Sequence, residues 1–361
     1  MDHSTSPQPH TGVLLVNLGT PDSPSVGDVR RYLREFLMDG RVIDIPFLSR
    51  FFLVNCIIAP FRAPKSAKVY QEVWTDAGSP LKVYSEELKR LLQTALGDGY
   101  RVSLGMRYQN PSLEKALEEL HDQGFRRLII VPLFPQYASA TTGSVKEKVM
   151  ALISQWQLIP ELTFVDQFYE HPLFVEAFTA LGKRYLEAEP FDHVLFSYHG
   201  LPERQIRKGD PHNHCLRDGC CDSVGPHNRL CYRAQCFQTS RLLAQALGLS
   251  DDQWTVCFQS RLGRDPWIQP YTEDVVKQLV AQGKKRVLAY SPAFVADCLE
   301  TTIEIGEEYK EVFMETGGER WQLVESLNVD PRWVATLQTM IQERSRAEHV
   351  SDEVPHTASL S

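Results

Sequence analysis

One histidine stands out as a residue that could do chemistry. His199 lies in the segment SYHGLP, directly after an apolar run, where Gly200 and Pro202 predict an abrupt turn. A lone histidine near such a run is usually a satisfied core group, but this turn would leave the imidazole at an exposed edge. Imidazole can ligate a transition metal or take up protons near neutral pH. The spacing alone does not decide between a core histidine and a catalytic one.

Three glutamates lie four residues apart in the segment DCLETTIEIGEEYKEVF, residues 297–313. Glu300, Glu304 and Glu308 would form one stripe along a helix. A solvated acidic face is the simpler interpretation of this stripe. Because the helix would begin directly after a strand, however, Glu300 should point into a cleft and Glu308 toward its rim. Such a row could carry protons or hydrated cations, since oxygen ligands suit hard cations and Fe²⁺ is intermediate in softness.

Five of the eight cysteines are clustered in the segment HCLRDGCCDSVGPHNRLCYRAQC. They are spaced C-x4-C-C-x9-C-x4-C, at Cys215, Cys220, Cys221, Cys231 and Cys236. An iron–sulfur cluster uses four thiolates, and five are available here. A structural zinc site would use four cysteines, or cysteines with His212, His214 or His227. Free surface thiols are the third interpretation, and we rank it last because idle clustered thiols are rare in the cytosol.

Composition and length limit the classes of function. The chain has 361 residues, of which 43% are hydrophobic and 23% charged, as in a soluble protein with room for two domains. Its net charge of −8 argues against a dedicated nucleic-acid binder. No signal peptide is visible, and the longest apolar stretch, residues 46–61, is too short to span a bilayer and contains Arg50 and Asn55. We therefore expect a cytoplasmic protein.

Strands and helices alternate along the chain and must position these residues. Long apolar runs predict buried parallel strands at residues 12–19, 101–108, 126–134, 161–168, 193–200, 254–260, 285–294 and 321–328. Amphipathic stretches predict helices at residues 27–37, 85–99, 111–124, 171–188, 238–248 and 272–283. The pattern indicates an α/β fold of two Rossmann-like, doubly wound domains, with a ligand cleft between them at the carboxyl ends of the strands.

The predicted domain limits follow from this pattern. The N-terminal domain would cover residues 11–188 and the C-terminal domain residues 189–330, followed by a terminal helix at 331–345. Polar tails at residues 1–10 and 346–361 are expected to be disordered. No GxGxxG or P-loop pattern is present, so no nucleotide cofactor is expected.

Eight motifs, in matching order and spacing, make residues 11–343 similar to the ferrochelatase family. They are LLVNLGTPDSP, WTDAGSPL, GMRYQNPSLEKAL, LFPQYASATTGS, SYHGLP, FQSRLGRDPW, PAFVADCLET and VESLN. The resemblance implies the class II chelatase fold and a lyase that inserts Fe²⁺ into protoporphyrin IX, releasing two protons, in the last step of heme biosynthesis. Coproporphyrin III, or another tetrapyrrole and metal, is the alternative substrate. The non-enzyme alternative is an Fe–S or tetrapyrrole-binding protein on the same fold.

The resemblance also implies roles for single residues. His199 matches the family's active-site histidine, Glu300 the glutamate facing it, and Glu304 and Glu308 the acidic row leading away. Cys298 replaces a residue that is often histidine in the family. The ring would be gripped by aromatic side chains, which we expect to be Tyr108, Phe134, Tyr137, Trp267 and Phe294. Phe134 and Phe168 stand where some relatives carry Tyr and Trp.

Two further segments gain an interpretation from the family. Some members carry a [2Fe–2S] cluster, and one subgroup draws all four ligands from an insertion at this place, here residues 211–236. This implies Cys215, Cys231 and Cys236 as ligands, with either Cys220 or Cys221 as the fourth. The apolar and then basic residues 46–70 match the lip of the cleft. They could be an ordinary buried helix or a peripheral membrane contact, and the chain could be a monomer or a homodimer.

Overall fold

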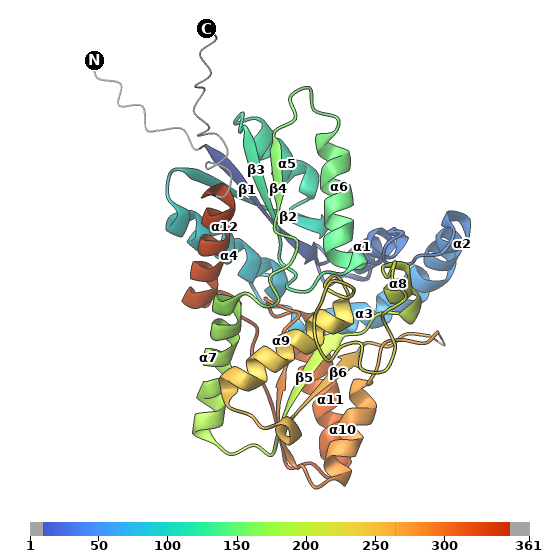
Figure 1. The fold of residues 1–361 in the computed structure, drawn as a ribbon. Coiled ribbons are helices and arrows are strands. Elements are labelled where there is room, and N and C mark those ends of the chain that lie inside the picture. Colours follow the sequence, from blue (N-terminus) through green and yellow to red (C-terminus); the bar gives the residue numbers. More distant parts are fainter. Residues whose placement is uncertain (1–9, 264, 347–361) are drawn as a thin grey trace.

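The computed structural model describes residues 10–263 and 265–346. Two parallel sheets with surrounding helices form an α/β architecture, which confirms the predicted fold class (Figure 1). The tails predicted at residues 1–10 and 346–361 lie outside the described residues, apart from His10 and Arg346.

The two sheets share one strand order. The first has the order β2-β1-β3-β4 and the second the order β6-β5-β7-β8. The strands of the first are β1 (Thr11–Gly19), β2 (Tyr100–Tyr108), β3 (Arg127–Pro132) and β4 (Glu161–Phe164). Those of the second are β5 (His193–His199), β6 (Trp254–Gln259), β7 (Arg286–Tyr290) and β8 (Arg320–Leu323). All pairs are parallel, so the four carboxyl ends of each sheet meet along one edge.

All eight predicted strands are present, but several end earlier than predicted. The predicted runs continue past β3, β4, β7 and β8 because apolar burial continues beyond the last residue of each strand. Leu133, Val165 and Val324, for example, are at most 3% exposed although each follows the end of its strand. An apolar run thus reports burial rather than the last paired residue.

The predicted helices are present with small shifts at their ends. They are α1 (Val26–Met38), α4 (Pro80–Leu96), α5 (Leu113–His121), α7 (Pro172–Ala188), α9 (Tyr232–Leu247), α10 (Thr272–Ala281) and the terminal α12 (Pro331–Arg346). The structure adds α6 (Ser144–Ile153), α8 (Glu203–Lys208) and the short turns η2 (Ser139–Gly143) and η3 (Asp251–Gln253). Ser25 and Ser112 cap α1 and α5 by accepting hydrogen bonds from the third residue on.

Helices α7 and α12 join the two halves. Helix α7 packs on α9, and α12 packs on both α4 and α7. The largest cluster of buried apolar side chains contains residues of both sheets, including Leu15 and Phe196. The predicted boundary between residues 188 and 189 falls where α7 ends, before β5 begins, yet the contacts of α7 and α12 hold both halves around one shared core.

The apolar stretch at residues 46–61 belongs to a longer helix that covers the whole predicted lip. Helix α2 (Phe47–Phe52), the π-helix η1 (Leu53–Ile58) and α3 (Ala59–Val73) form one continuous helix, whose first part projects from the body (Figure 1). By length and composition alone, this 27-residue helix could cross a membrane. The prediction that the segment is too short was wrong, because Arg62, Pro64 and Lys65 do not end the helix.

The acidic segment is also helical, but not as an α-helix. Residues Glu300–Glu308 form a π-helix, η4, which continues into α11 (Tyr309–Glu315). A π turn closes on the fifth residue rather than the fourth, so residues four apart still lie near one face. The predicted stripe survives this change, and π-helical segments are frequent at functional sites.

Candidate active site

His199 is the last residue of β5 and lies at the carboxyl edge of the second sheet. It is partly exposed and pairs in register with Gln259 of β6. Its Nδ1 lies 2.7 Å from the carbonyl oxygen of Gly200. Because a carbonyl only accepts, this bond requires a proton on Nδ1, and in the neutral ring Nε2 is then the nitrogen that can accept a proton or bind a metal. The imidazole lies 6.4 Å, ring centre to ring centre, from Trp267.

Glu304 is a half-buried carboxylate that interacts with this histidine. It accepts hydrogen bonds from Ser260 Oγ at 2.6 Å and from Gln259 Nε2 at 3.1 Å. Burial raises the pKa of the Glu304 carboxyl, while the bond from Ser260 and the charge of His199 oppose that rise. The group can therefore hold a proton at a higher pH than an ordinary glutamate, next to an imidazole.

Glu300 begins η4 and faces the N-terminal half. Its charge, after burial, contributes to raising the pKa values of the Tyr70 and Tyr32 hydroxyls. These rings come from α3 and α1 and lie 6.3 Å apart, edge to face. The sequence analysis missed both tyrosines, because a tyrosine in an amphipathic helix looks like any core residue. The site thus combines the π-helix of one half with two helices of the other.

Exposure along the acidic row increases only at its last member. Glu300 and Glu304 are half-buried, whereas Glu308 is exposed. Cys298, just before the row, is buried, and burial followed by the charge of Glu300 raises the pKa of its thiol. The thiol therefore stays neutral near pH 7.

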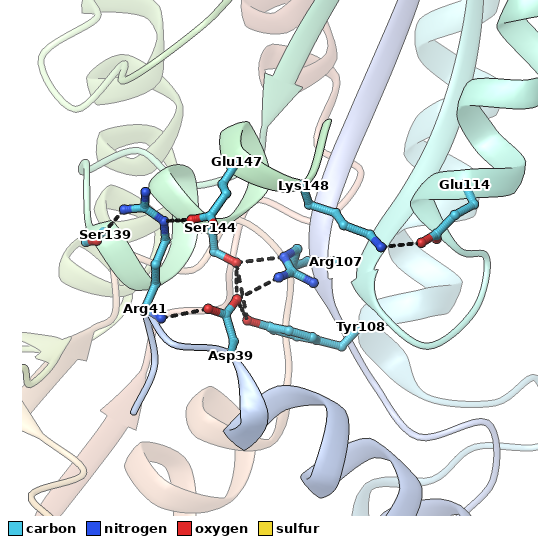
Figure 2. Close-up of polar contacts among 9 residues, drawn as sticks. All are labelled: Asp39, Arg41, Arg107, Tyr108, Glu114, Ser139, Ser144, Glu147 and Lys148. Carbon is cyan, nitrogen blue, oxygen red and sulfur yellow. Dashed lines mark hydrogen bonds and ion pairs between the residues drawn. The ribbon is translucent and has the colours of Figure 1, made fainter. Parts of the chain in front are cut away.

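Tyr108 is placed in the core rather than on an open surface. It is 0% exposed and its ring meets that of Phe36 edge to face at 5.1 Å. Its hydroxyl donates to Asp39 Oδ2 at 2.9 Å, and the same carboxylate accepts bonds from Arg107 Nη2 at 2.6 Å and from Ser144. Figure 2 shows these groups converging on Asp39, with Arg41 beside them. A ligand could reach Tyr108 only after these neighbours moved.

The other predicted porphyrin contacts are spread over the molecule. Trp267 lies beside His199, and Phe294 packs with Leu81, Tyr84, Ala296 and Cys298 near the start of η4. Phe134 packs with the cluster of Leu14, Val16 and Ile130, on the face of the first sheet away from the shared core. Phe168 is buried 5.5 Å from Trp333. The structure therefore brings Trp267 to the histidine, while Phe134 packs against a core cluster. Phe168, which was not a predicted contact, lies in the shared core.

Tyr137 lines a separate pocket of about 200 Å³ beneath the cysteine-rich insertion. Leu201 and Gln205 line the same pocket from the histidine's side, and His212, His227 and Tyr232 from the insertion. The insertion therefore packs directly against the turn that follows His199.

The clustered cysteines are mostly buried. Cys215, Cys220, Cys221 and Cys236 are each at most 6% exposed, and Cys220 and Cys221 have sulfur atoms 3.6 Å apart. Cys231 interacts with Cys215, Cys221 and Cys236, so four thiols surround one region. Burial raises the pKa of Cys221, opposed by Arg233, whose Nη1 lies 3.0 Å from the sulfur. In the described part of the chain, no three His, Cys, Asp or Glu side chains are arranged to hold a single metal ion.

Comparison with known proteins decides the family. The family model described as Ferrochelatase matches residues 10–345. The chain belongs to the ferrochelatase family. It is 47% identical to a ferrochelatase of Legionella pneumophila (strain Lens) over 92% of this chain and 99% of that protein. It is also 47% identical to a ferrochelatase of Coxiella burnetii (strain Dugway 5J108-111), over 92% of this chain and 93% of the other. Family members insert iron into a porphyrin during heme biosynthesis, and this chain is such a metal chelatase.

Solved structures agree on the fold. SirB from Bacillus subtilis with Fe³⁺ matches with a TM-score of 0.53 and 12% identity, over 94% of this chain and 97% of that one. The cobalt complex of the sirohydrochlorin chelatase SirB from Bacillus subtilis subspecies spizizenii matches with a TM-score of 0.51 and 11% identity, over the same shares of the two chains. These likenesses place the fold among the class II chelatases.

Proposed function

We propose that this protein, a lyase, inserts Fe²⁺ into protoporphyrin IX and that His199 and Glu300 carry the reaction. The observation that carries the proposal is the neighbourhood of His199. Its imidazole, which bonds the Gly200 carbonyl through Nδ1, interacts with the half-buried Glu304, which continues the row begun by Glu300. The row ends at the exposed Glu308, which gives protons a way to solvent.

Iron insertion exchanges two pyrrole N–H protons for one Fe²⁺. The porphyrin nitrogens must lose both protons as the metal binds, so a group that accepts protons lowers the barrier. Nε2 of His199 can take a proton or bind the metal, and Glu300 offers a carboxylate on the other side of the site. Glu304, whose pKa burial raises, can receive the proton and pass it outward to Glu308.

The preference for protoporphyrin is supported by the apolar lip. The exposed side chains of Phe47, Phe52 and Phe61 are each at least 60% accessible, which suits a substrate with fewer charged groups. Coproporphyrin III carries two more carboxylates and is the alternative that the test separates.

The experiment is anaerobic Fe²⁺ insertion with both porphyrins, followed by absorbance. We expect protoporphyrin IX to have the higher kcat/KM, and His199→Ala to abolish insertion. Faster iron insertion into coproporphyrin III would show that this porphyrin, and not protoporphyrin IX, is the preferred substrate. Near-normal rates in both His199→Ala and Glu300→Gln would show that the chemistry lies elsewhere.

We also propose that the lip contacts a membrane surface without crossing it. Ala59, Ala63 and Ala67 line one buried side of α3, which keeps this helix against α1. The exposed apolar side chains lie mainly on α2 and η1, at Phe47, Phe52 and Ile57. The basic residues Arg62, Lys65 and Lys68 are exposed next to them on α3, as in helices that lie in a membrane interface. The protein would then be cytoplasmic and peripherally attached.

A liposome co-sedimentation assay tests the membrane contact. The triple variant Phe47→Ser, Phe52→Ser, Phe61→Ser should lose sedimentation with liposomes. The control Leu158→Ser removes an apolar side chain that is 82% exposed outside the lip, and it should sediment like wild type. Absence of binding by the wild type would remove the proposal.

The cysteine-rich insertion is proposed to hold a [2Fe–2S] cluster. Four largely buried thiols lie around one region, and the Arg233 guanidinium beside Cys221 favours thiolate there. A two-iron cluster is wider than one ion, so its ligands need not converge on one point, in contrast to zinc. Cys215, Cys231 and Cys236 would be ligands, and Cys221 suits the fourth position because it interacts with Cys231 and Cys236. Such a cluster would cross-link the cysteine-rich loop. It would take no direct part in the insertion of iron into the porphyrin.

Anaerobically purified protein should contain acid-labile sulfide and absorb visible light. Cys221→Ser should lose both signals, whereas Cys56→Ser, an exposed thiol on the lip, should keep them. One zinc ion per chain without acid-labile sulfide would show that the segment holds a zinc site and not an iron–sulfur cluster.

A further inference from the structure

One tyrosine connects the cysteine-rich insertion to the active site. Tyr232 is the first residue of α9 and directly follows Cys231. It is 7% exposed, and its hydroxyl donates a hydrogen bond to the backbone carbonyl of His199 at 2.9 Å. The thiol of Cys236, one turn further along α9, interacts with the same hydroxyl.

This bond fixes the peptide plane next to the imidazole. The His199 carbonyl and the Gly200 N–H belong to one peptide unit. The Gly200 N–H donates to the carbonyl of Gln259 at 2.8 Å, so the plane is held from both sides. The imidazole then bonds to the following carbonyl, that of Gly200. A rotation of this peptide would therefore move the ring.

The turn has little space in which to adjust by itself. A β-carbon on Gly200 would lie 2.7 Å from the Gln259 carbonyl oxygen and 3.1 Å from the Trp267 ring. Only glycine fits there, and glycine leaves the backbone free to rotate once a partner is lost. The Tyr232 hydroxyl supplies the restraint on the other side.

We propose that Tyr232 is a positioning residue that holds His199 in its reactive orientation. Through Tyr232, the rate of iron insertion depends on the cysteine-rich segment, residues 211–236. The inference rests on the proposed role of His199. It gives the cysteine-rich segment a function in the reaction, because the segment that carries the thiols also carries the Tyr232 hydroxyl that holds the histidine.

The test compares two tyrosine-to-phenylalanine variants. Tyr232→Phe keeps the ring and removes the hydroxyl. Tyr198→Phe is the matched control, because its equally buried hydroxyl bonds Ser240 at 2.8 Å, on the same helix, and does not hold the His199 carbonyl. We expect Tyr232→Phe to lower kcat about threefold to tenfold, the value of one neutral hydrogen bond, with the KM for porphyrin unchanged. Tyr198→Phe should keep its kcat within about twofold of wild type.

A second readout distinguishes positioning from general stability. In protein labelled with ¹³C-histidine, the resonance of His199, identified by its loss in His199→Ala, should shift in Tyr232→Phe and stay in Tyr198→Phe. A Tyr232→Phe variant with the kcat of wild type and an unshifted His199 resonance would overturn the inference. An equal loss of kcat in both variants would also overturn it, since it would indicate damage to the core.

Failure of the proposed function would look different. If His199→Ala kept its activity, both the role of His199 and this inference would be wrong. If His199→Ala lost activity while Tyr232→Phe behaved like wild type, only the inference would be wrong.

Discussion

The two sheets have the same strand order, but they use the polar residues at their strand ends in opposite ways. At the edge of the first sheet, Asp39, Arg107, Tyr108 and Ser144 are buried and satisfy one another. At the edge of the second, His199, Glu300 and Glu304 are partly exposed, and Glu304 accepts hydrogen bonds from the neutral side chains of Ser260 and Gln259. One edge therefore stabilises the fold, and the other keeps groups that can still exchange protons.

The largest expected effect concerns the inner end of the acidic row. Glu300→Gln keeps the shape and removes the charge, so kcat for iron insertion should fall by about 10²-fold to 10⁴-fold, the usual value of a proton-transfer group. Glu308→Gln, at the exposed end, is the control and should lose less than about threefold. Similar losses of kcat in Glu300→Gln and Glu308→Gln would contradict the expectation that the inner glutamate contributes more to the reaction than the exposed one.

The opposite edge should respond in stability rather than in rate. Asp39→Asn leaves the buried Arg107 without its ion pair, whose side chains are 8% and 14% exposed. The free energy of unfolding should fall by about 3 kcal/mol, measured by urea denaturation. Its kcat at a temperature where it is folded should change less than tenfold. A loss of activity as large as that of Glu300→Gln, without loss of stability, would break the comparison.

The same carboxyl makes the stability depend on pH. Burial tends to raise the pKa of Asp39, but the bonds from Ser144 and the Arg41 N–H and the charge of Arg107 outweigh it, so the pKa is lowered. A lowered carboxyl pKa contributes stability above the unfolded value, near 3.9, and this is lost as pH falls through the folded value. The difference in stability between wild type and Asp39→Asn should thus be full at pH 6 and shrink below about pH 4. A difference independent of pH would argue against the ion pair.

The smallest effect is expected at Ser260. Its hydroxyl lowers the pKa of Glu304, so Ser260→Ala should raise that pKa further. The carboxylate accepts protons only when it is ionised, so the acid limb of the kcat profile should move to higher pH by less than about one unit. The control is Ser326→Ala, which alters a buried serine whose backbone N–H bonds Asp297 rather than Glu304. Its acid limb should stay at the wild-type pH. An acid limb that stays in place while the basic limb moves to higher pH would show that Glu304 acts in its protonated form.

The strands could be predicted because they depend on burial, and the exposed position of Glu308 agrees with the direction expected for the acidic row. Strands buried on both faces give unbroken apolar runs, and a row that starts at a strand end must run from the interior to solvent. The π-helix could not be predicted, since α- and π-turns use the same residues. Tyr32 and Tyr70 were missed because α1 and α3 reach Glu300 only through the packing of two halves. Tyr108 was expected in the cleft, but an aromatic at a strand end can equally turn into the core, as it does here.

The central claim is that the chemistry lies at the edge of the second sheet and not of the first. The most direct test is single-turnover insertion, in which Fe²⁺ is mixed anaerobically with protein already holding porphyrin. His199→Ala should bind porphyrin, as judged by its fluorescence, and insert iron at least about 10²-fold more slowly than wild type, whereas folded Asp39→Asn should stay within tenfold. Insertion at the wild-type rate by His199→Ala would contradict the account.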